Sequence, residues 1–366
     1  YLKRLSILNF KNIQQADLSF SPQINCFIGI NGQGKTNVLD SIYYLSFCKS
    51  SNTTSDLNVI RHNEEFFMLQ GEYFMNSLGV NHVICSVKRK GRKHLKWNDK
   101  EAKRFSEHWG RIPLVLISPS DSSLVVGGSE DRRRFMDSTI SQYDSTYLQM
   151  LIRYENALKQ RNFILRQESN IDLGVLDVYE DIMSQCGSYI FEQRKLFLED
   201  FLLFFKGIYS SLCNNENEVV DIEYISNGFL GDFKEQLKNG RAKERIVGYS
   251  LYGIHKDELL LKFNGFPIKQ EGSQGQIKTF FIALKLSQFK FLKSKGKDKT
   301  PLLLLDDIFD KLDFGRVSNI INFVSSKDFG QIFITDTNEE HLNHIFEMVN
   351  CDFKLFKMEN GVVSLQ

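Results

Sequence analysis

Residues 28–37, IGINGQGKTN, decide the fold. Gly29, Gly34, Lys35 and Thr36 complete the pattern G-x-x-x-x-G-K-[ST]. The segment before the loop, SPQINCF, alternates like a strand, and the segment after it, VLDSIYYLSF, reads as a helix. A glycine-rich turn between a strand and a helix predicts a P-loop, whose backbone N–H groups cradle nucleotide phosphates. The loop does not by itself say what the nucleotide is used for.

The residue types of the loop have separate expected roles. Gly29, Gly32 and Gly34 let the backbone approach the phosphates without side-chain clashes. Lys35 supplies a positive charge to the β- and γ-phosphates, and the Thr36 hydroxyl is a candidate ligand of Mg²⁺. The predicted nucleotide-binding residues are therefore Gly29, Ile30, Asn31, Gly32, Gln33, Gly34, Lys35 and Thr36.

A second segment, LLLLDDIFDKLD at 302–313, predicts the acidic half of the same site. Its four leucines are typical of a parallel strand that is buried on both faces. Two acids follow at the carboxyl end of this strand, where open α/β sheets place their ligands. We expect Asp306 to hold Mg²⁺ and Asp307 to polarise an attacking water. Lys35 and Asp306 are 271 positions apart, so a large insertion separates the two halves.

A third segment, EGSQGQIKTFFIALKL at 271–286, predicts a helix that begins at a Gly/Ser turn. Its apolar stripe consists of Ile277, Phe280, Phe281 and Leu284. Ser273 is a candidate N-cap, and the helix start favours an anion because its N–H groups and dipole point outward. The P-loop helix already serves the phosphate of its own chain, so a second copy of the protein could present this anion. The alternative is an ordinary capped helix. The candidate residues are Ser273, Gln274, Gly275 and Gln276.

Composition is that of a soluble globular protein. The 366 residues are 42% hydrophobic and 25% charged, which is enough chain for two lobes. No apolar run approaches the roughly 20 residues of a membrane span, and the first residues lack a signal-peptide pattern. Six scattered cysteines without a C-x-x-C pair predict reduced thiols in the cytoplasm. His341 and His344 favour a solvated helix face over a metal site.

Three segments organise the chain. Residues 1–118 are rich in strand signals and carry the P-loop, so we expect them to begin an ATPase lobe. Residues 119–295 are mostly helical, with two long amphipathic helices of roughly 25–30 residues and the 271–286 segment. Residues 296–366 return to strands and carry Asp306 and Asp307, completing the first lobe. The predicted fold class is α/β.

Basic residues gather at two places although the net charge is only +1. VKRKGRKHLKW at 87–97 predicts a hairpin with a basic tip that can neutralise phosphates, and the alternative is a solvated hairpin. Its candidate DNA contacts are Lys88, Arg89, Lys90, Arg92 and Lys93. Arg132, Arg133 and Arg134 lie near a helix start, where cations oppose the dipole. We expect acids of the protein or phosphates as their partners.

Several motifs in this order resemble those of ABC-type ATPases. S-x-G-Q opening a helix, followed by hhhhDD and then x-L-D, is the order of that superfamily. LSILNFKNI and LDSIYYLSF on either side of the P-loop are similar to its SMC-like branch. PSDSSLVVGGSEDRRRFMDS at 119–138 and YGIHKDELLL at 252–261 resemble segments of the RecF family. The resemblance runs from residue 2 to about 338.

The resemblance implies a fold, ligands and partners. The fold is an ABC-type P-loop ATPase head with mixed sheets around the P-loop helix and a largely helical second lobe. The implied cofactors are ATP and Mg²⁺, the latter held by Thr36 and Asp306. Leu312 and Asp313 correspond to the D-loop, and Ser273–Gln276 to the signature that acts in trans. An ATP-dependent homodimer would bind double-stranded, single-stranded or gapped DNA as a weak DNA-dependent ATPase. With RecO and RecR it would load recombinase at gaps, in recombinational repair, replication restart and the response to DNA damage.

The sequence departs from the family pattern at several positions, and two of these departures bear on the rate of ATP hydrolysis. Asp307 stands where transporter ATPases carry Glu, and a shorter carboxylate lies further from the water, so slow hydrolysis is expected. The segment IFITDTN has no switch histidine, and Thr335 or Asp336 occupies that region. Ile254 replaces the usual Pro and Lys256 the usual Arg of the RecF segment.

Other readings of the P-loop fit less well. The alternative that remains is the ATPase head of another SMC-like or ABC-type system. A membrane transporter subunit is disfavoured by the long helical insertion and the missing switch histidine. A coiled-coil SMC machine needs heptads over hundreds of residues, and a GTPase needs an N-K-x-D motif, which does not follow the P-loop.

Overall fold

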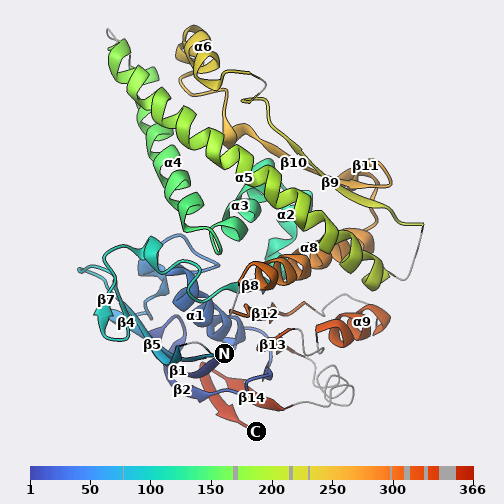
Figure 1. Cartoon of the computed structure of the whole chain (residues 1–366). Coiled ribbons are helices and arrows are strands. Elements are labelled where there is room, and N and C mark those ends of the chain that lie inside the picture. Colours follow the sequence, from blue (N-terminus) through green and yellow to red (C-terminus); the bar gives the residue numbers. More distant parts are fainter. Residues whose placement is uncertain are drawn as a thin grey trace. The chain divides into compact units, whose positions relative to one another are not determined.

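The computed structural model describes residues 1–76, 78–167, 172–213, 217–229, 231–296, 299–308, 314–324, 329–337 and 352–366. The predicted D-loop residues Leu312 and Asp313, and the histidines at 341 and 344, lie outside these ranges. The chain divides into two compact units (Figure 1). Unit 1 is Tyr1–Asp121 with Leu284–Gln366, and unit 2 is Ser122–Ala283. The sequence placed the boundaries at 118/119 and 295/296, whereas the second boundary of the structure falls inside one long helix.

A six-stranded sheet of mainly parallel strands forms one layer of unit 1, in the order β15-β14-β3-β13-β12-β8. Its strands are β3 (Ile24–Ile28), β8 (Leu114–Ile117), β12 (Leu302–Asp306), β13 (Ile332–Asp336), β14 (Phe353–Glu359) and β15 (Val362–Leu365). All residues of β3, β12 and β13 are buried, because the inner strands of a parallel sheet are covered on both faces. The predicted leucine strand is therefore confirmed. The carboxyl ends of β3 and β12 carry the P-loop and the two acids.

An antiparallel sheet forms a second layer of unit 1, in the order β2-β1-β4-β5-β6-β7. Its strands are β1 (Leu2–Phe10), β2 (Ile13–Ser19), β4 (Phe66–Met75), β5 (Gly79–Lys88), β6 (His94–Trp97) and β7 (Lys100–Glu101). The P-loop helix α1 (Lys35–Phe47) contacts β1, β4 and β5 of this sheet and β8, β12 and β13 of the parallel sheet. Leu39, Ile42 and Leu45 of α1 belong to the shared hydrophobic core. The helix thus lies between the two sheets, as predicted.

The other described elements assigned wholly or mostly to unit 1 lie before, between or after these strands in the chain. They are η1 (Asp56–Val59), η2 (Phe105–Glu107), η3 (Pro119–Ser122), α9 (Phe314–Val324) and the second part of α8 (Gln274–Lys295). None of the described helices combines the length and the apolar character that crossing a membrane requires.

Unit 2 is mostly helical, with one small antiparallel sheet in the order β11-β10-β9. The helices are α2 (Ser123–Val126), α3 (Ser129–Ile140), α4 (Ser145–Leu165), α5 (Leu173–Cys213), α6 (Phe233–Val247), η4 (Ile254–Lys256) and α7 (Ile268–Glu271). The strands are β9 (Val220–Ile225), β10 (Glu258–Phe263) and β11 (Phe266–Pro267). Helices α4 and α5 lie side by side (Figure 1). With 41 residues α5 is longer than predicted, because the apolar spacing continues without a break to Leu212.

Buried ion pairs join the helices of unit 2. Arg194 of α5 binds Asp137 at 2.9 Å and Asp257 at 2.8 Å. It also donates a 2.8 Å hydrogen bond to the carbonyl oxygen of Ile254. Breaking such a buried network is costly, because each remaining partner keeps an uncompensated charge.

The three consecutive arginines of α3 have partners within the chain. Arg132 binds Glu258 at 2.7 Å, and Arg134 binds Glu130 at 2.8 Å. Arg133 donates to the backbone carbonyl of Asp257 at 2.7 Å. Of the two partners expected from the sequence, the structure pairs Arg132 and Arg134 with acids of the protein.

Candidate nucleotide site

The P-loop turns tightly between β3 and α1. Gly29, Gly32 and Gly34 have φ values of +159°, +83° and +109°. A Cβ atom at Gly34 would lie 2.6 Å from Oδ1 of Asn12, so both the backbone angle and the space require glycine there. Gly34 is the N-cap of α1 and makes no side-chain cap, so the helix begins with its positive end at the loop.

The Lys35 side chain folds back against the backbone of this loop. Its side chain is buried, and Nζ donates hydrogen bonds to the carbonyl oxygens of Gly29 at 2.5 Å and Ile30 at 3.1 Å. Burial lowers the pKa of the ammonium, and the charges of Asp307, Asp306 and Asp336 oppose this effect. A cation that is partly desolvated and surrounded by loop carbonyls can transfer its hydrogen bonds to a phosphate.

Asp306 lies opposite the start of α1. Its Oδ1 accepts hydrogen bonds from the Thr36 hydroxyl at 2.9 Å and from the Thr335 hydroxyl at 2.7 Å. Burial raises the pKa of the Asp306 carboxyl, although the two hydroxyl donors and the charge of Lys35 pull it down. The structure therefore brings the two predicted Mg²⁺ ligands, Thr36 and Asp306, into direct contact. A hydroxyl and a carboxylate beside a phosphate loop are oxygen ligands of the kind that Mg²⁺ prefers.

Asp307 follows with a left-handed backbone, at φ +49°. Its N–H is bonded to the side-chain oxygen of Thr335 at 3.0 Å and to the backbone carbonyl of Thr335 at 3.3 Å. Thr335 is thus hydrogen-bonded to both Asp306 and Asp307, a role that the sequence did not indicate. Asp336, the other candidate for the switch position, is buried, and its charge partly opposes the lowering of the Lys35 pKa by burial.

The predicted signature residues lie at the start of helix α8 in unit 2. The Ser273 side chain accepts from the N–H of Gln276 at 3.3 Å, and Oε1 of Gln276 accepts from the N–H of Ser273 at 2.9 Å. This reciprocal pair is a capping box, so the predicted N-cap is confirmed. Nε2 of Gln276 donates to Glu218 at 3.0 Å, which fixes the side chain of Gln276. Ser273 and Gln274 are exposed, whereas Phe280, Phe281 and Leu284 of the predicted stripe are buried.

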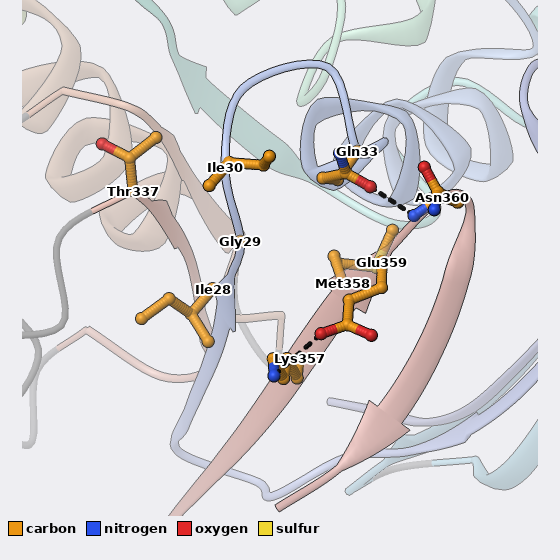
Figure 2. A pocket seen from close by; sticks show the side chains of 9 residues that line it. All are labelled: Ile28, Gly29, Ile30, Gln33, Thr337, Lys357, Met358, Glu359 and Asn360. Carbon is orange, nitrogen blue, oxygen red and sulfur yellow. Dashed lines mark hydrogen bonds and ion pairs between the residues drawn. The ribbon is translucent and has the colours of Figure 1, made fainter.

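A pocket of about 630 Å³ adjoins the P-loop (Figure 2). It is lined by Ile28, Gly29, Ile30, Gln33, Thr337, Lys357, Met358, Glu359 and Asn360. Four of these residues come from β14 and from the turn after it, in which Asn360 has φ +50°. Lys357 and Glu359, two positions apart in β14, form an ion pair of 2.8 Å. The C-terminal hairpin therefore forms one wall of the pocket beside the P-loop, which no local pattern in the sequence indicated.

The basic hairpin between β5 and β6 forms as predicted. Lys88, Arg89, Lys90 and Arg92 are exposed, although Arg89 also donates to the carbonyl oxygen of Glu64 at 2.7 Å.

Lys93 differs from the other four candidates of this hairpin. It binds Asp56 at 2.6 Å, donates to the carbonyl oxygen of Cys48 at 2.6 Å, and lies over the ring of Tyr44. The Lys93 ammonium is therefore bound by groups within unit 1.

Comparison with known proteins agrees with this geometry. The RecF/RecN/SMC N terminal domain matches residues 1–363. A DNA replication and repair protein RecF from Phocaeicola vulgatus is 50% identical over 363 residues, covering 99% of this chain and 98% of that protein. A protein of the same name from Porphyromonas gingivalis strain W83 is 45% identical over 365 residues, covering 99% of both chains.

Solved structures show the same architecture. The recombination mediator protein RecF with ATPrS, of the RecFOR pathway, has a TM-score of 0.89 at 26% identity, and covers 100% of this chain and 98% of that one. An Smc head bound to the C-winged helix domain of ScpA has a TM-score of 0.59 at 15% identity, covers 100% of this chain and 97% of that one, and shares the fold alone. The predicted ABC-type head fold is confirmed, and the chain belongs to the RecF family.

Proposed function

We propose that this chain is an ATP-dependent DNA-binding protein of recombinational repair and replication restart. The observation that carries the proposal is the contact between Thr36 and Asp306, next to the buried Lys35. This contact assembles the P-loop and the acidic strand end into one site, as ATP hydrolysis requires. The relatives that bear the RecF name, and the RecF structures with ATP and ATPrS, support ATP as the nucleotide and DNA as the target.

Mg²⁺ would be held by the Thr36 hydroxyl and the Asp306 carboxylate. The ion supplies charge that neutralises the phosphates during transfer. Lys35 would leave its loop carbonyls for the β- and γ-phosphates, and the positive end of α1 would face the same anion. Asp307 would accept a hydrogen bond from the attacking water and orient it. Because Asp is shorter than Glu, we expect slow hydrolysis, so that the ATP-bound state persists.

The signature residues would complete the site from a second copy of the chain. Ser273 is exposed at the start of α8, and its capping box leaves the positive end of this helix toward solvent. ATP would then join two protomers, and hydrolysis would separate them. The exposed cations of the β5–β6 hairpin would contribute to DNA binding by neutralising phosphates.

Family membership also supports a set of partners and a location. We propose that the ATP-bound dimer binds double-stranded, single-stranded or gapped DNA, and that the bound DNA stimulates its weak ATPase activity. With RecO and RecR it would promote loading of recombinase at gaps, in the cytoplasm and without a membrane.

Mixing two inactive variants tests the composite site. Ser273→Arg should leave ATP binding by the monomer nearly intact but block dimer closure and hydrolysis. Lys35→Ala should fail because it does not hold ATP. A mixed dimer combines the intact P-loop of the first chain with the intact signature of the second. With random exchange roughly a quarter of all sites are then wild type on both sides, under two-fold symmetry.

Partial ATPase activity should therefore reappear on mixing. If the signature acts within its own chain, every chain stays inactive and mixing restores nothing. Co-purification of two different tags must first show that mixed dimers form.

A further inference from the structure

We propose that four residues from three distant parts of the chain form a latch that fixes the P-loop before nucleotide arrives. The latch consists of Asn12 in the β1–β2 turn, Gln33 in the P-loop, and Asn360 and Gly361 in the β14–β15 turn. Asn12 and Gly361 would be positioning residues, acting on the phosphates through Gln33. The inference rests on the proposed function only in requiring that the P-loop binds ATP.

The backbone carbonyl of Gln33 is the centre of the latch. It accepts a hydrogen bond of 3.0 Å from Nδ2 of Asn12 and another of 3.0 Å from the N–H of Gly361. A carbonyl oxygen has two lone pairs, and both are thereby used by donors outside the loop. A carbonyl turned toward the phosphates would repel them. Holding this one in place leaves the N–H groups of the loop to form the anion site.

Asn12 binds the loop on its helical side as well. Its Oδ1 accepts a 2.7 Å hydrogen bond from the side chain of Asn37, in the first turn of α1. The same oxygen would be only 2.6 Å from a Cβ atom at position 34, so the amide occupies the space that Gly34 leaves open. One amide therefore connects the two ends of the turn that leads from Gln33 into α1.

The C-terminal hairpin reaches the loop because of its place in the sheet. Strand β14 runs parallel to β3, the strand that ends at the P-loop, with Lys357 beside Ile28. The chain then turns at Asn360, whose N–H donates to Oε1 of Gln33 (Figure 2). Gly361 has φ +81°, and a Cβ atom there would lie 2.5 Å from the carbonyl oxygen of Asn12. Any side chain at position 361 would push the hairpin away from the loop.

A fixed loop binds phosphate more tightly because little ordering remains to be done on binding. Loss of the latch should therefore weaken ATP binding without changing the chemical step. Losing two of these hydrogen bonds should leave the loop less ordered before binding and raise the Kd for ATP roughly tenfold. In kinetic terms the KM should rise while kcat at saturating ATP stays near the wild-type value.

The test compares Asn12→Ala and Gly361→Ala with a matched control, Gln14→Ala. Gln14 is an exposed amide of β2, two residues after Asn12, and it belongs to neither the latch nor the pocket beside the P-loop. Titration of the full-length chain with a fluorescent ATP analogue gives Kd, steady-state hydrolysis gives KM and kcat, and thermal unfolding without nucleotide gives Tm. We expect a roughly tenfold higher Kd for Asn12→Ala and Gly361→Ala, with two hydrogen bonds lost in each, and a nearly unchanged Kd for Gln14→Ala.

Gln33→Ala adds a mild variant in case Gly361→Ala does not fold. It removes only the acceptor of the Asn360 N–H and keeps the carbonyl, so a rise of roughly threefold is expected. Wild-type affinity in both Asn12→Ala and Gln33→Ala would overturn the latch. So would a higher Kd that is explained by a lower Tm, or a change that appears in kcat and not in KM. If the wild-type chain binds no ATP, the proposed function fails instead, so the two failures are distinct.

Discussion

The hydroxyl of Thr36 donates a 2.9 Å hydrogen bond to Oδ1 of Asp306, across 270 positions of sequence. Thr36 lies in the first turn of α1, and Asp306 ends β12, so the bond joins the helix and the sheet that the large insertion separates in the chain. The second donor to the same oxygen, Thr335, comes from the neighbouring strand β13. The acid is therefore held from two sides before any metal arrives, although its burial disfavours the charge.

Asp306→Asn should stabilise the protein in the absence of nucleotide at neutral pH, by about 1 kcal/mol, while abolishing hydrolysis. Burial is the largest effect on the Asp306 pKa and raises it, so the folded state disfavours the carboxylate relative to the unfolded chain. The wild-type chain then loses stability as pH rises through the folded pKa. The advantage of Asn should appear over that window and vanish at acid pH, where Asp306 is protonated. Thermal unfolding of both proteins at neutral and acid pH measures this difference. A lower Tm of the Asn variant at neutral pH would show that the attraction of Lys35 outweighs burial.

Lys35→Ala should weaken ATP binding roughly hundredfold, because it removes charge-assisted hydrogen bonds to the phosphates. Dimerisation in ATP should be lost with it. Sedimentation with and without ATP measures the dimer, and titration measures the affinity. Lys100→Ala, at an exposed lysine of β7 in the same unit, is the matched control and should bind ATP normally. Dimers that still form in ATP after Lys35→Ala would contradict the role of the P-loop.

Asp307→Asn should keep ATP bound and slow hydrolysis by roughly a hundredfold or more, within the range of general-base catalysis. Asn tolerates the left-handed backbone at this position, φ +49°, so the substitution changes the charge and not the fold. Dimers and DNA complexes should then last longer. Single-turnover hydrolysis and dissociation from labelled DNA measure the two effects. Failure to bind ATP would instead make Asp307 a metal ligand or a structural residue.

Combined substitution of Lys88, Lys90 and Arg92 by Gln should weaken DNA binding and flatten its dependence on salt. Each lost phosphate contact should reduce the slope of log K against log salt by about 0.9 on duplex DNA, or about 0.7 on a single strand. ATP affinity should not change, because these side chains are exposed on the hairpin tip. An unchanged salt slope would show that the hairpin is only solvated.

Lys93→Gln is the control for this experiment. Because Lys93 binds Asp56 and the carbonyl oxygen of Cys48, its loss should cost about 1 to 3 kcal/mol of stability in urea unfolding. It should leave the salt dependence of DNA binding unchanged. A salt slope that falls as much as in the triple variant would return Lys93 to the DNA-contacting group.

Features that depend on neighbouring residues could be predicted from the sequence. The strand, glycine turn and helix around residues 28–37, the leucine strand before Asp306, and the N-cap at Ser273 each depend on residues close together in the sequence. Their physical causes are local: backbone angles that only glycine adopts easily, the burial of continuous apolar runs, and side chains that satisfy the first N–H groups of a helix. The meeting of Lys35, Thr36 and Asp306 could be predicted too, because the carboxyl ends of parallel strands lie at one edge of a sheet.

The partners of single side chains were decided only by the tertiary structure. Nothing around Asn12 or Gly361 indicates the P-loop, because their contact with Gln33 exists only once β14 pairs with β3 and the β1–β2 turn lies beside α1. For the same reason the sequence predicted Lys93 as one more DNA contact of the basic hairpin, whereas in the structure it binds Asp56 within unit 1. Periodicity records which face of an element is buried, and it carries no information about which distant element covers that face. Strand order and close packing supply that information, and here they assign the side chains that hold the phosphate loop.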